Sequence, residues 1–210
     1  MGKPRVIIAD DHRLFAAGLE RLLAPECDVV ATVYDGRMLI DEVRRLRPDV
    51  VVQDLSMPPL NGITAIRDIH EVDPQIRIVV VTMWEDAALA AEAFRVGASA
   101  FLLKTCAVSE LLEAVRFALH HKSYVTPIIA SGMIESLMHQ GRDGEADPHL
   151  TARQREVLRL LAEGKSMKEV AAALNLTVRT VAFHKYRMMQ MLNIKTSAEL
   201  VRFAVVQHIV

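Results

Sequence analysis

The first 122 residues alternate between short apolar runs and segments with helical spacing, and this alternation constrains the fold more than any other feature. The apolar runs are rich in Val and Ile, which is typical of strands covered on both faces of a sheet. They lie at 5–9, 29–33, 50–52, 76–81 and 100–103, and the helical segments lie at 14–23, 38–46, 63–69, 87–96 and 108–119. Five strands alternating with five helices predict an α/β doubly wound, five-stranded parallel sheet with helices on both faces.

Residues 123–148 interrupt this alternation and separate it from a second region. Residues 125–139 are consistent with one more helix, whereas the stretch from Gly141 to Pro148 is polar and typical of a flexible linker. Residues 149–210 look wholly helical, with capping-box start signals at Thr151, Ser166 and Thr196. Four helices are expected there, at 152–162, 167–174, 178–192 and 197–207. We therefore expect an α/β domain at 1–122, a linker with a helix at 123–148, and an all-α four-helix domain at 149–210.

The charge of the chain divides between the two regions. Residues 1–148 carry 15 Lys and Arg against 22 Asp and Glu, a net charge of −7, whereas residues 149–210 carry 10 against 4, a net charge of +6. A basic domain beside an acidic one favours nucleic acid as a partner of the basic domain, although charge clustering on two solvated surfaces would produce the same split.

Composition narrows the class of protein. A chain with 51% apolar and 24% charged residues is typical of a globular protein rather than a disordered one. Its two cysteines leave no disulfide framework and no thiolate zinc site. The longest apolar run, from Ile78 to Trp84, is far too short for a bilayer, and the first residues do not resemble a secretory signal. We expect a soluble, cytoplasmic protein without a membrane partner.

Polar side chains stand at the ends of the predicted strands. Asp10 and Asp11 follow the first strand, and Asp54 ends the third. Thr82 and Lys104 end the fourth and fifth. In a doubly wound sheet, ligands bind beyond the carboxyl ends of the strands, where the strand order reverses. With the flavodoxin-like order 2-1-3-4-5, the first and third strands are neighbours, so the three carboxylates converge.

Three carboxylates this close repel one another, and they stay ionised only when a cation joins them. Oxygen ligands favour Mg²⁺, and one carboxylate can then attack a phosphoryl group to form an aspartyl phosphate. Lys104 can pair with one phosphoryl oxygen, and the Thr82 hydroxyl can bond another. Each residue taken singly is equally well explained as a cap or a surface charge, and it is their combination that predicts the site.

These motifs together resemble the receiver domain of bacterial two-component response regulators. The matching residues are Asp10-Asp11-His12, Asp54-Leu-Ser-Met-Pro58, Asn61-Gly62, Thr82 and Phe101-Leu-Leu-Lys104-Thr105. The resemblance implies that Asp54 accepts phosphate from a sensor histidine kinase. It also implies that Mg²⁺ is held by Asp54, by Asp11 directly and by Asp10 mostly through water. Thr82 and Phe101 match the switch pair, in which the hydroxyl moves to the phosphoryl group and the aromatic ring follows inward.

Two residues depart from the pattern of that family. Pro59 stands where relatives often have Gly, so the loop after Asp54 is expected to be stiffer. Trp84 lies two residues beyond Thr82, next to the switch. It has two interpretations, an aromatic packed on the surface or a side chain that controls access to Asp54.

The basic region resembles the LuxR-type helix-turn-helix. The matching residues are Leu150-Thr-Ala-Arg-Gln-Arg-Glu-Val-Leu158, Ala162-Glu-Gly-Lys165, Glu169-Val-Ala-Ala172 and Thr180-Val181-x-x-His184. The two resemblances cover nearly the whole chain, and their pairing is the mark of the NarL/FixJ response regulators. The helix at 178–192 is then expected to enter the major groove of DNA.

Helical spacing divides the side chains of this helix between two faces. Val178, Val181, Lys185, Met188 and Leu192 share one face, which we interpret as largely core. The side chains expected to point away are those of Arg179, Ala182, Phe183, Tyr186, Arg187 and Gln190. The candidate DNA contacts are Arg179, Thr180, Ala182, Phe183, His184, Lys185, Tyr186 and Arg187.

These candidates differ in what they can recognise. Arg179, Lys185 and Arg187 are predicted phosphate contacts, which position a protein on DNA without specifying sequence. His184 is either a donor to the DNA backbone or a packed or solvated histidine. Ala182 and Phe183 are apolar where relatives often have charged or hydroxyl residues. Phe183 either contacts a thymine methyl group or forms, with Tyr186, an apolar patch for a protein partner.

The leading hypothesis is a response regulator of a two-component system. A sensor histidine kinase phosphorylates it at Asp54, and this switches a helix-turn-helix transcription factor that binds double-stranded operator DNA, with a homodimer expected on phosphorylation or DNA binding. A phosphatase or phosphotransferase that uses Asp54 as nucleophile is the alternative, but the chain has no Gly-rich phosphate loop and no Asp-x-Asp around Asp54, so we do not expect an enzyme. A third hypothesis is an interaction module whose partner is a protein rather than DNA.

Overall fold

The computed structural model describes residues 2–57, 62–139, 150, 152–174, 176–207 and 209–210, and of residues 136–139, 152 and 179 only the backbone. Within these residues the chain forms two compact units, Met1–Met138 and His139–Val210. The expected polar linker after residue 139 and the loop containing Pro59 lie outside the described residues.

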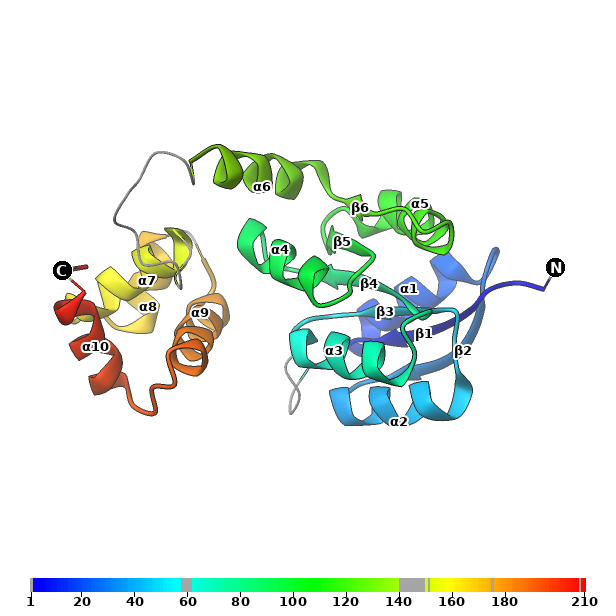
Figure 1. Ribbon diagram of the computed structural model, residues 1–210, viewed down its shortest axis with the longest axis horizontal. Coiled ribbons are helices and arrows are strands. Elements are labelled where there is room, and N and C mark those ends of the chain that lie inside the picture. Colours follow the sequence, from blue (N-terminus) through cyan, green and yellow to red (C-terminus); the bar gives the residue numbers. More distant parts are fainter. Residues whose placement is uncertain (1, 58–61, 140–149, 151, 175, 208) are drawn as a thin grey trace. The chain divides into compact units, whose positions relative to one another are not determined.

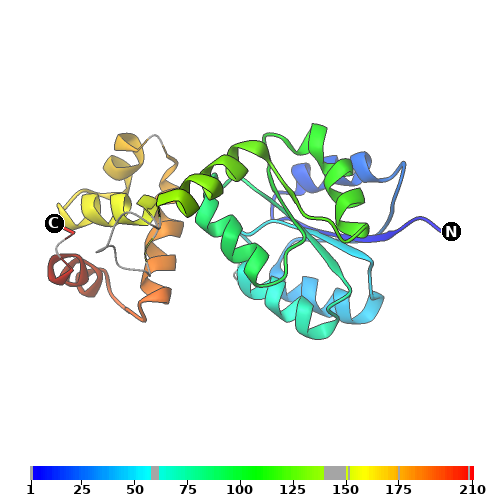
Figure 2. The ribbon, with the colours of Figure 1, turned by 45° about the horizontal axis from the view of Figure 1, so that its top comes forward.

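The first unit is a parallel sheet with helices on both faces (Figures 1 and 2). Its strands are β1 (Arg5–Ala9), β2 (Asp28–Val33), β3 (Val50–Gln53), β4 (Arg77–Thr82), β5 (Ala100–Leu103) and β6 (Tyr124–Val125). Its helices are α1 (Arg13–Leu23), α2 (Gly36–Leu46), α3 (Gly62–Val72), α4 (Ala87–Arg95), α5 (Ala107–Leu119) and α6 (Pro127–His139). The strand order is β2-β1-β3-β4-β5-β6, which confirms the doubly wound α/β fold and adds a sixth strand to the five expected.

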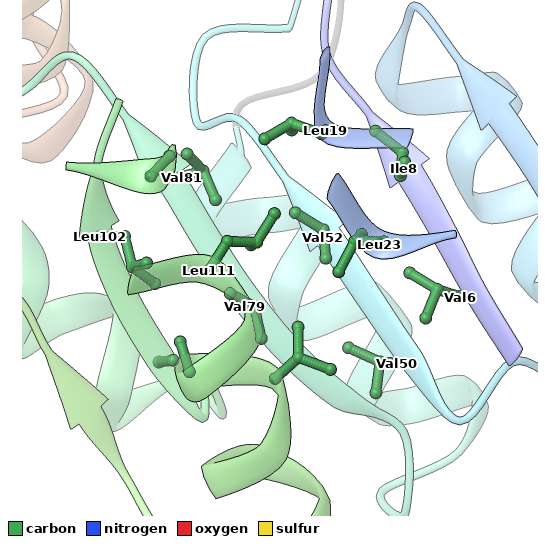
Figure 3. Close-up of a cluster of buried hydrophobic side chains, with 14 of the residues drawn as sticks. Val6, Ile8, Leu19, Leu23, Val50, Val52, Val79, Val81, Leu102 and Leu111 are labelled. Atoms are coloured by element: carbon green, nitrogen blue, oxygen red, sulfur yellow. The ribbon is translucent and has the colours of Figure 1, made fainter. Parts of the chain in front are cut away.

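Apolar side chains on both faces of the sheet hold this unit together. One cluster gathers alternate residues of the central strands, such as Val6, Val52 and Val79, against Leu19 of α1 and Leu111 of α5 (Figure 3). The strand residues between them, such as Ile7, Val51 and Val80, are also fully buried, because successive side chains of a strand point to opposite faces. Burial on both faces explains why the strands read as continuous apolar runs in the sequence.

The register of the strands brings their carboxyl ends to one edge of the sheet. Ala9 pairs with Gln53, Gln53 with Val80, and Thr82 with Leu103. The backbone N–H of Asp54 still donates to the carbonyl of Ala9 at 2.8 Å. The chain therefore leaves β1, β3 and β5 at neighbouring points of this edge.

Thr126 joins the unexpected strand β6 to the end of β5. Its backbone N–H donates to the Phe101 carbonyl at 3.0 Å, and its hydroxyl accepts from the Leu103 N–H at 3.3 Å. The same hydroxyl donates to Glu110 Oε2 of α5 at 2.9 Å. Burial and the negative charge of Glu110 raise the pKa of the neighbouring Tyr124 to about 12. Only two residues of β6 pair with β5, which is too short a segment for a hydropathy pattern to reveal.

The second unit consists, among the described residues, of four helices: α7 (Ala152–Ala162), α8 (Met167–Ala173), α9 (Val178–Met191) and α10 (Ser197–Val206). The capping boxes expected at Ser166 and Thr196 are present, and the Thr177 side chain caps α9. A cluster that includes Leu158, Val170, Val181, Met188 and Leu200 forms the core. No helix in the described part of the chain is long and apolar enough to cross a membrane.

Replacing Thr126 by Val should destabilise the first unit. The change leaves the buried Leu103 N–H without its side-chain acceptor and removes one of the hydrogen bonds to Glu110, which we expect to cost about 1–3 kcal/mol. Urea unfolding followed by the fluorescence of Trp84, the only tryptophan, reports on this unit alone. Thr126→Ser, which keeps the hydroxyl, should recover most of the loss, and an unchanged midpoint for Thr126→Val would contradict the role assigned to these bonds.

Candidate functional site

Three carboxylates meet at the carboxyl edge of the sheet, as their positions in the sequence led us to expect. One ligand atom each from Asp10, Asp11, His12 and Asp54 lies within 4.8 Å of the others. Asp10 and Asp54 are buried, whereas Asp11 is partly exposed. Backbone amides orient the buried pair, since the His12 N–H donates to Asp10 Oδ1 at 2.8 Å and the Ser56 N–H to Asp54 Oδ1 at 3.2 Å.

Lys104 brings a buried positive charge to this cluster. Its Nζ lies 2.6 Å from Asp10 Oδ2 and 2.8 Å from Asp54 Oδ2, and its side chain is only 5% exposed. The backbone N–H of Lys104 donates to the Thr82 carbonyl at 2.7 Å, which ties the end of β5 to the end of β4. The ammonium group therefore bridges the two buried carboxylates and offsets part of their repulsion.

Burial governs the protonation of Asp10. Loss of water around the carboxylate raises its pKa, and the negative charge of Asp54 adds to this effect. The hydrogen bond from Lys104 and the one from the His12 N–H act in the opposite direction but do not cancel it. The ionised form of Asp10 is thus costly in the isolated protein, and a further cation beside it would relieve that cost.

The donor set fits a hard divalent cation. The carboxylates of Asp10, Asp11 and Asp54 supply oxygen ligands, and the partial exposure of Asp11 leaves a side of the cluster open to water. Mg²⁺ keeps several waters and takes few protein ligands, so a cluster of this kind could hold it.

The expected switch residues lie on adjacent strands. Thr82 ends β4 and Phe101 is the second residue of β5, and both are fully buried. The Thr82 hydroxyl accepts a hydrogen bond from the Trp84 N–H at 3.3 Å. In the described conformation the hydroxyl is therefore engaged by the loop that follows its own strand.

Trp84 is buried rather than packed on the surface. Its side chain is 6% exposed, and its Nε1–H donates to Ser56 Oγ at 2.8 Å. This bond joins the loop after β4 to the loop after β3, two residues beyond Asp54. Of the two interpretations of Trp84, the surface aromatic is wrong, and control of access to Asp54 stays a prediction.

Two residues near the site, His12 and Phe15, were not among the site residues predicted from the sequence. His12 Nδ1 lies 2.7 Å from Asp11 Oδ1, so its imidazole is part of the acidic cluster. The ring of Phe15 in α1 lies 4.6 Å, centroid to Nζ, from Lys104. Adjacency to the aspartate pair could have suggested His12. The contact of Phe15 with Lys104 spans 89 positions of sequence, and only the tertiary packing, which places α1 against α5, creates it.

The buried face of α9 differs from the one expected. His184 and Arg187 are buried, at 2% and 8% exposure, whereas Val178 is 40% exposed. The core stripe runs through Val181, His184 and Met188, at spacings of three and four residues, so the apolar Val178 was a misleading guide to the core face. The expectation that Arg187 points away from the core is therefore wrong.

The remaining candidates of α9 stay closer to the surface. Tyr186 is 60% exposed, and Thr180, Ala182, Phe183 and Lys185 are half-buried. The Arg187 guanidinium lies 5.9 Å from the centroid of the Phe183 ring. The side chain of Arg179 lies outside the described residues.

Comparison with known protein families identifies a matching family for each of the two units. Residues 6–116 match the response regulator receiver domain, and residues 148–204 match the bacterial regulatory proteins of the luxR family. The chain is 34% identical to the oxygen regulatory protein NreC of Staphylococcus carnosus, over 95% of this chain and 96% of that protein. It is 30% identical to the transcriptional regulatory protein DegU of Brevibacillus brevis, over 95% and 92%.

Solved structures lead to the same assignment. The RcsB response regulator of Salmonella typhimurium aligns over 98% of this chain and 100% of its own, with 29% identity and a TM-score of 0.61. An RcsB–DNA complex aligns over 97% of this chain and 98% of its own, with 27% identity and a TM-score of 0.61.

The chain is therefore a two-component response regulator, built from a receiver unit and a LuxR-type DNA-binding unit. It belongs to the NarL/FixJ family, whose members regulate transcription and are not enzymes.

Replacing Asp10 by Asn should stabilise the receiver unit at neutral pH when no divalent cation is present. Since the folded-state pKa of Asp10 is raised, its stabilising contribution is present below the unfolded pKa and is lost as pH rises through the folded value. The gain in melting temperature should therefore be largest at pH 7–8 and shrink toward pH 4. Asp11→Asn, at a more exposed carboxylate, should change the melting temperature less. A lower melting temperature for Asp10→Asn at pH 7–8 would show that the charge of Asp10 is stabilising.

Proposed function

We propose that Asp54 is the residue phosphorylated by the sensor histidine kinase. The observation that carries this proposal is the buried Asp54 carboxylate beside Asp10, Asp11 and the ammonium of Lys104. A carboxylate oxygen of Asp54 attacks the phosphorus, and the bond from phosphorus to the kinase histidine nitrogen breaks. Lys104, already 2.8 Å from Asp54 Oδ2, then pairs with a phosphoryl oxygen.

Mg²⁺ is the cofactor that we propose for this step, with Asp10, Asp11 and Asp54 as its ligands. When bound, it neutralises charge on the phosphoryl oxygens. Thr82 releases the Trp84 N–H and donates its hydroxyl to the phosphoryl group. Phe101, which pairs with Val80 of the neighbouring strand β4, is the aromatic member of the switch.

The DNA contact surface that we propose is the less buried side of α9. Lys185 and Tyr186 lie on it, with Thr180, Ala182 and Phe183 beside them, and we add Arg179 from the sequence alone. His184 and Arg187 support the helix from its buried side and are not proposed as primary contacts. Among the structures compared above, the RcsB–DNA complex is a precedent for a related chain bound to DNA.

We also propose the domain limits and the assembly. The receiver comprises residues 1–122, the linker with α6 residues 123–148, and the DNA-binding domain residues 149–210. Strand β6, at the start of the linker, adds to the edge of the receiver sheet. A single helix-turn-helix contacts few bases, so a homodimer on two half-sites one helical turn apart would raise affinity. A regulator that meets both a sensor kinase and operator DNA works in the cytoplasm.

The phosphorylation proposal predicts that wild type, but not Asp54→Asn, is modified by acetyl phosphate in the presence of Mg²⁺. Intact-mass spectrometry should show the addition of one phosphoryl group to wild type and none to the variant. Asp11→Ala should also lose modification, because one metal ligand is removed. Asp49→Asn, at an aspartate just before β3, is the control and should behave as wild type. Phosphorylation of Asp54→Asn at normal stoichiometry would exclude Asp54 as the acceptor.

The DNA-binding proposal predicts different effects at neighbouring positions of α9. Lys185→Ala should weaken binding to operator and random DNA alike and reduce the salt dependence by about one counterion. Phe183→Ala should cost about 1–3 kcal/mol on the operator and little on random DNA. The measurement is DNA affinity by fluorescence anisotropy across salt concentrations, with the exposed Arg202→Ala of α10 as control. If Phe183→Ala changes oligomerisation and leaves operator preference intact, Phe183 is a protein contact.

A further inference from the structure

We propose that the aromatic ring of Phe15 keeps the Lys104 ammonium at the site when a metal ion is bound to the carboxylates. The proposed phosphorylation does not itself require this role. Phe15 is thus a positioning residue that acts through Lys104. This inference rests on the proposed function of Asp54.

The surroundings of Lys104 carry the argument. Its ammonium has two kinds of partner, the carboxylates of Asp10 and Asp54 at 2.6 and 2.8 Å and the ring of Phe15 at 4.6 Å from Nζ to centroid. The ring distance lies within the range of cation–π attraction, which strengthens when the cation is removed from water. Lys104 is 5% exposed, so the contact is made in a desolvated setting.

The position of Phe15 is itself well supported. It lies in the first turn of α1, three residues after His12, and it is half-buried against the core cluster that contains Leu19 and Leu111. The ring is therefore held by the packing of α1 and does not have to be ordered when Lys104 meets it.

The two kinds of partner respond differently to a metal ion. A divalent cation at Asp10 and Asp54 neutralises the charges that attract Lys104 and repels the ammonium directly. The ring of Phe15 binds no metal in this cluster, and its attraction for the ammonium persists. Without the ring, the flexible Lys104 side chain is free to move its charge toward water, as lysines at the edge of apolar surface do.

Two opposite effects follow from losing the ring. Lys104 held at the site opposes the metal ion, so Phe15→Leu should bind Mg²⁺ more tightly, by roughly 2- to 5-fold. Lys104 must be in place to meet a phosphoryl oxygen, so Phe15→Leu should bind the phosphoryl mimic beryllofluoride more weakly, by roughly 2- to 30-fold. General damage to the fold would instead lower the affinity for both Mg²⁺ and beryllofluoride.

The experiment uses the full-length chain and isothermal titration calorimetry. Mg²⁺ alone is titrated first, and beryllofluoride is titrated at saturating Mg²⁺, for wild type, Phe15→Leu and Phe15→Trp. A second series places 4-fluoro-, 3,5-difluoro- and pentafluoro-phenylalanine at position 15, which progressively removes the negative face of the ring at nearly constant shape. Phe94→Leu, at a half-buried phenylalanine of α4, is the matched control and should leave both affinities unchanged.

The expected result is a rise in Mg²⁺ affinity and a fall in beryllofluoride affinity that both grow with fluorination, with Phe15→Trp close to wild type. If pentafluoro-phenylalanine behaves as wild type, the ring acts only by filling space and the inference is overturned. It is also overturned if both affinities fall together or neither changes. If wild type itself binds no beryllofluoride while Mg²⁺ affinity responds to fluorination, the positioning of Lys104 stands and the proposed phosphorylation fails.

Discussion

The chemistry of the receiver unit depends on a buried cluster of unlike charges, Asp10 and Asp54 with Lys104 between them. Charges removed from water are costly unless each is paired and hydrogen-bonded. Here the pairing is incomplete, since burial still raises the pKa of Asp10. A cation bound at such a site would lower the cost of the buried negative charge, because it would offset charge that Lys104 alone does not balance. The apolar sheet beneath supplies the stability that such a cluster does not.

Strand β5 connects this cluster to the rest of the unit. It carries Phe101 and is followed directly by Lys104, and its edge is covered by β6. Thr126 bonds to the backbone on both sides of Leu102, through Phe101 and Leu103, and α6 begins at the next residue. The charged end of β5 and the start of α6 are therefore parts of one hydrogen-bonded structure, and the chain continues from α6 toward the DNA-binding unit.

Helix α9 shows how a local pattern can mislead. His184 and Arg187 are buried, so the buried face of α9 is rotated about the helix axis relative to the face that its apolar residues predicted. A polar side chain can fill a core position when the neighbouring helices accommodate it, and no count of apolar residues within one helix contains that information. In the receiver, where the sheet supplies a long and regular apolar surface, the spacing of apolar residues correctly predicted the strands and helices.

The succession of strands and helices, the doubly wound fold and the edge at which the aspartates gather were predictable from the chain alone. The reason is that helical and strand spacings and the positions of strand ends are local properties. Other features became visible only once the elements were packed together: Trp84 is buried against Ser56, β6 extends the sheet, α9 buries His184, and the ring of Phe15 faces Lys104. These contacts join residues far apart in the chain or on different elements. Their geometry is set by how helices pack on the sheet, and that packing is a property of the whole fold rather than of any segment.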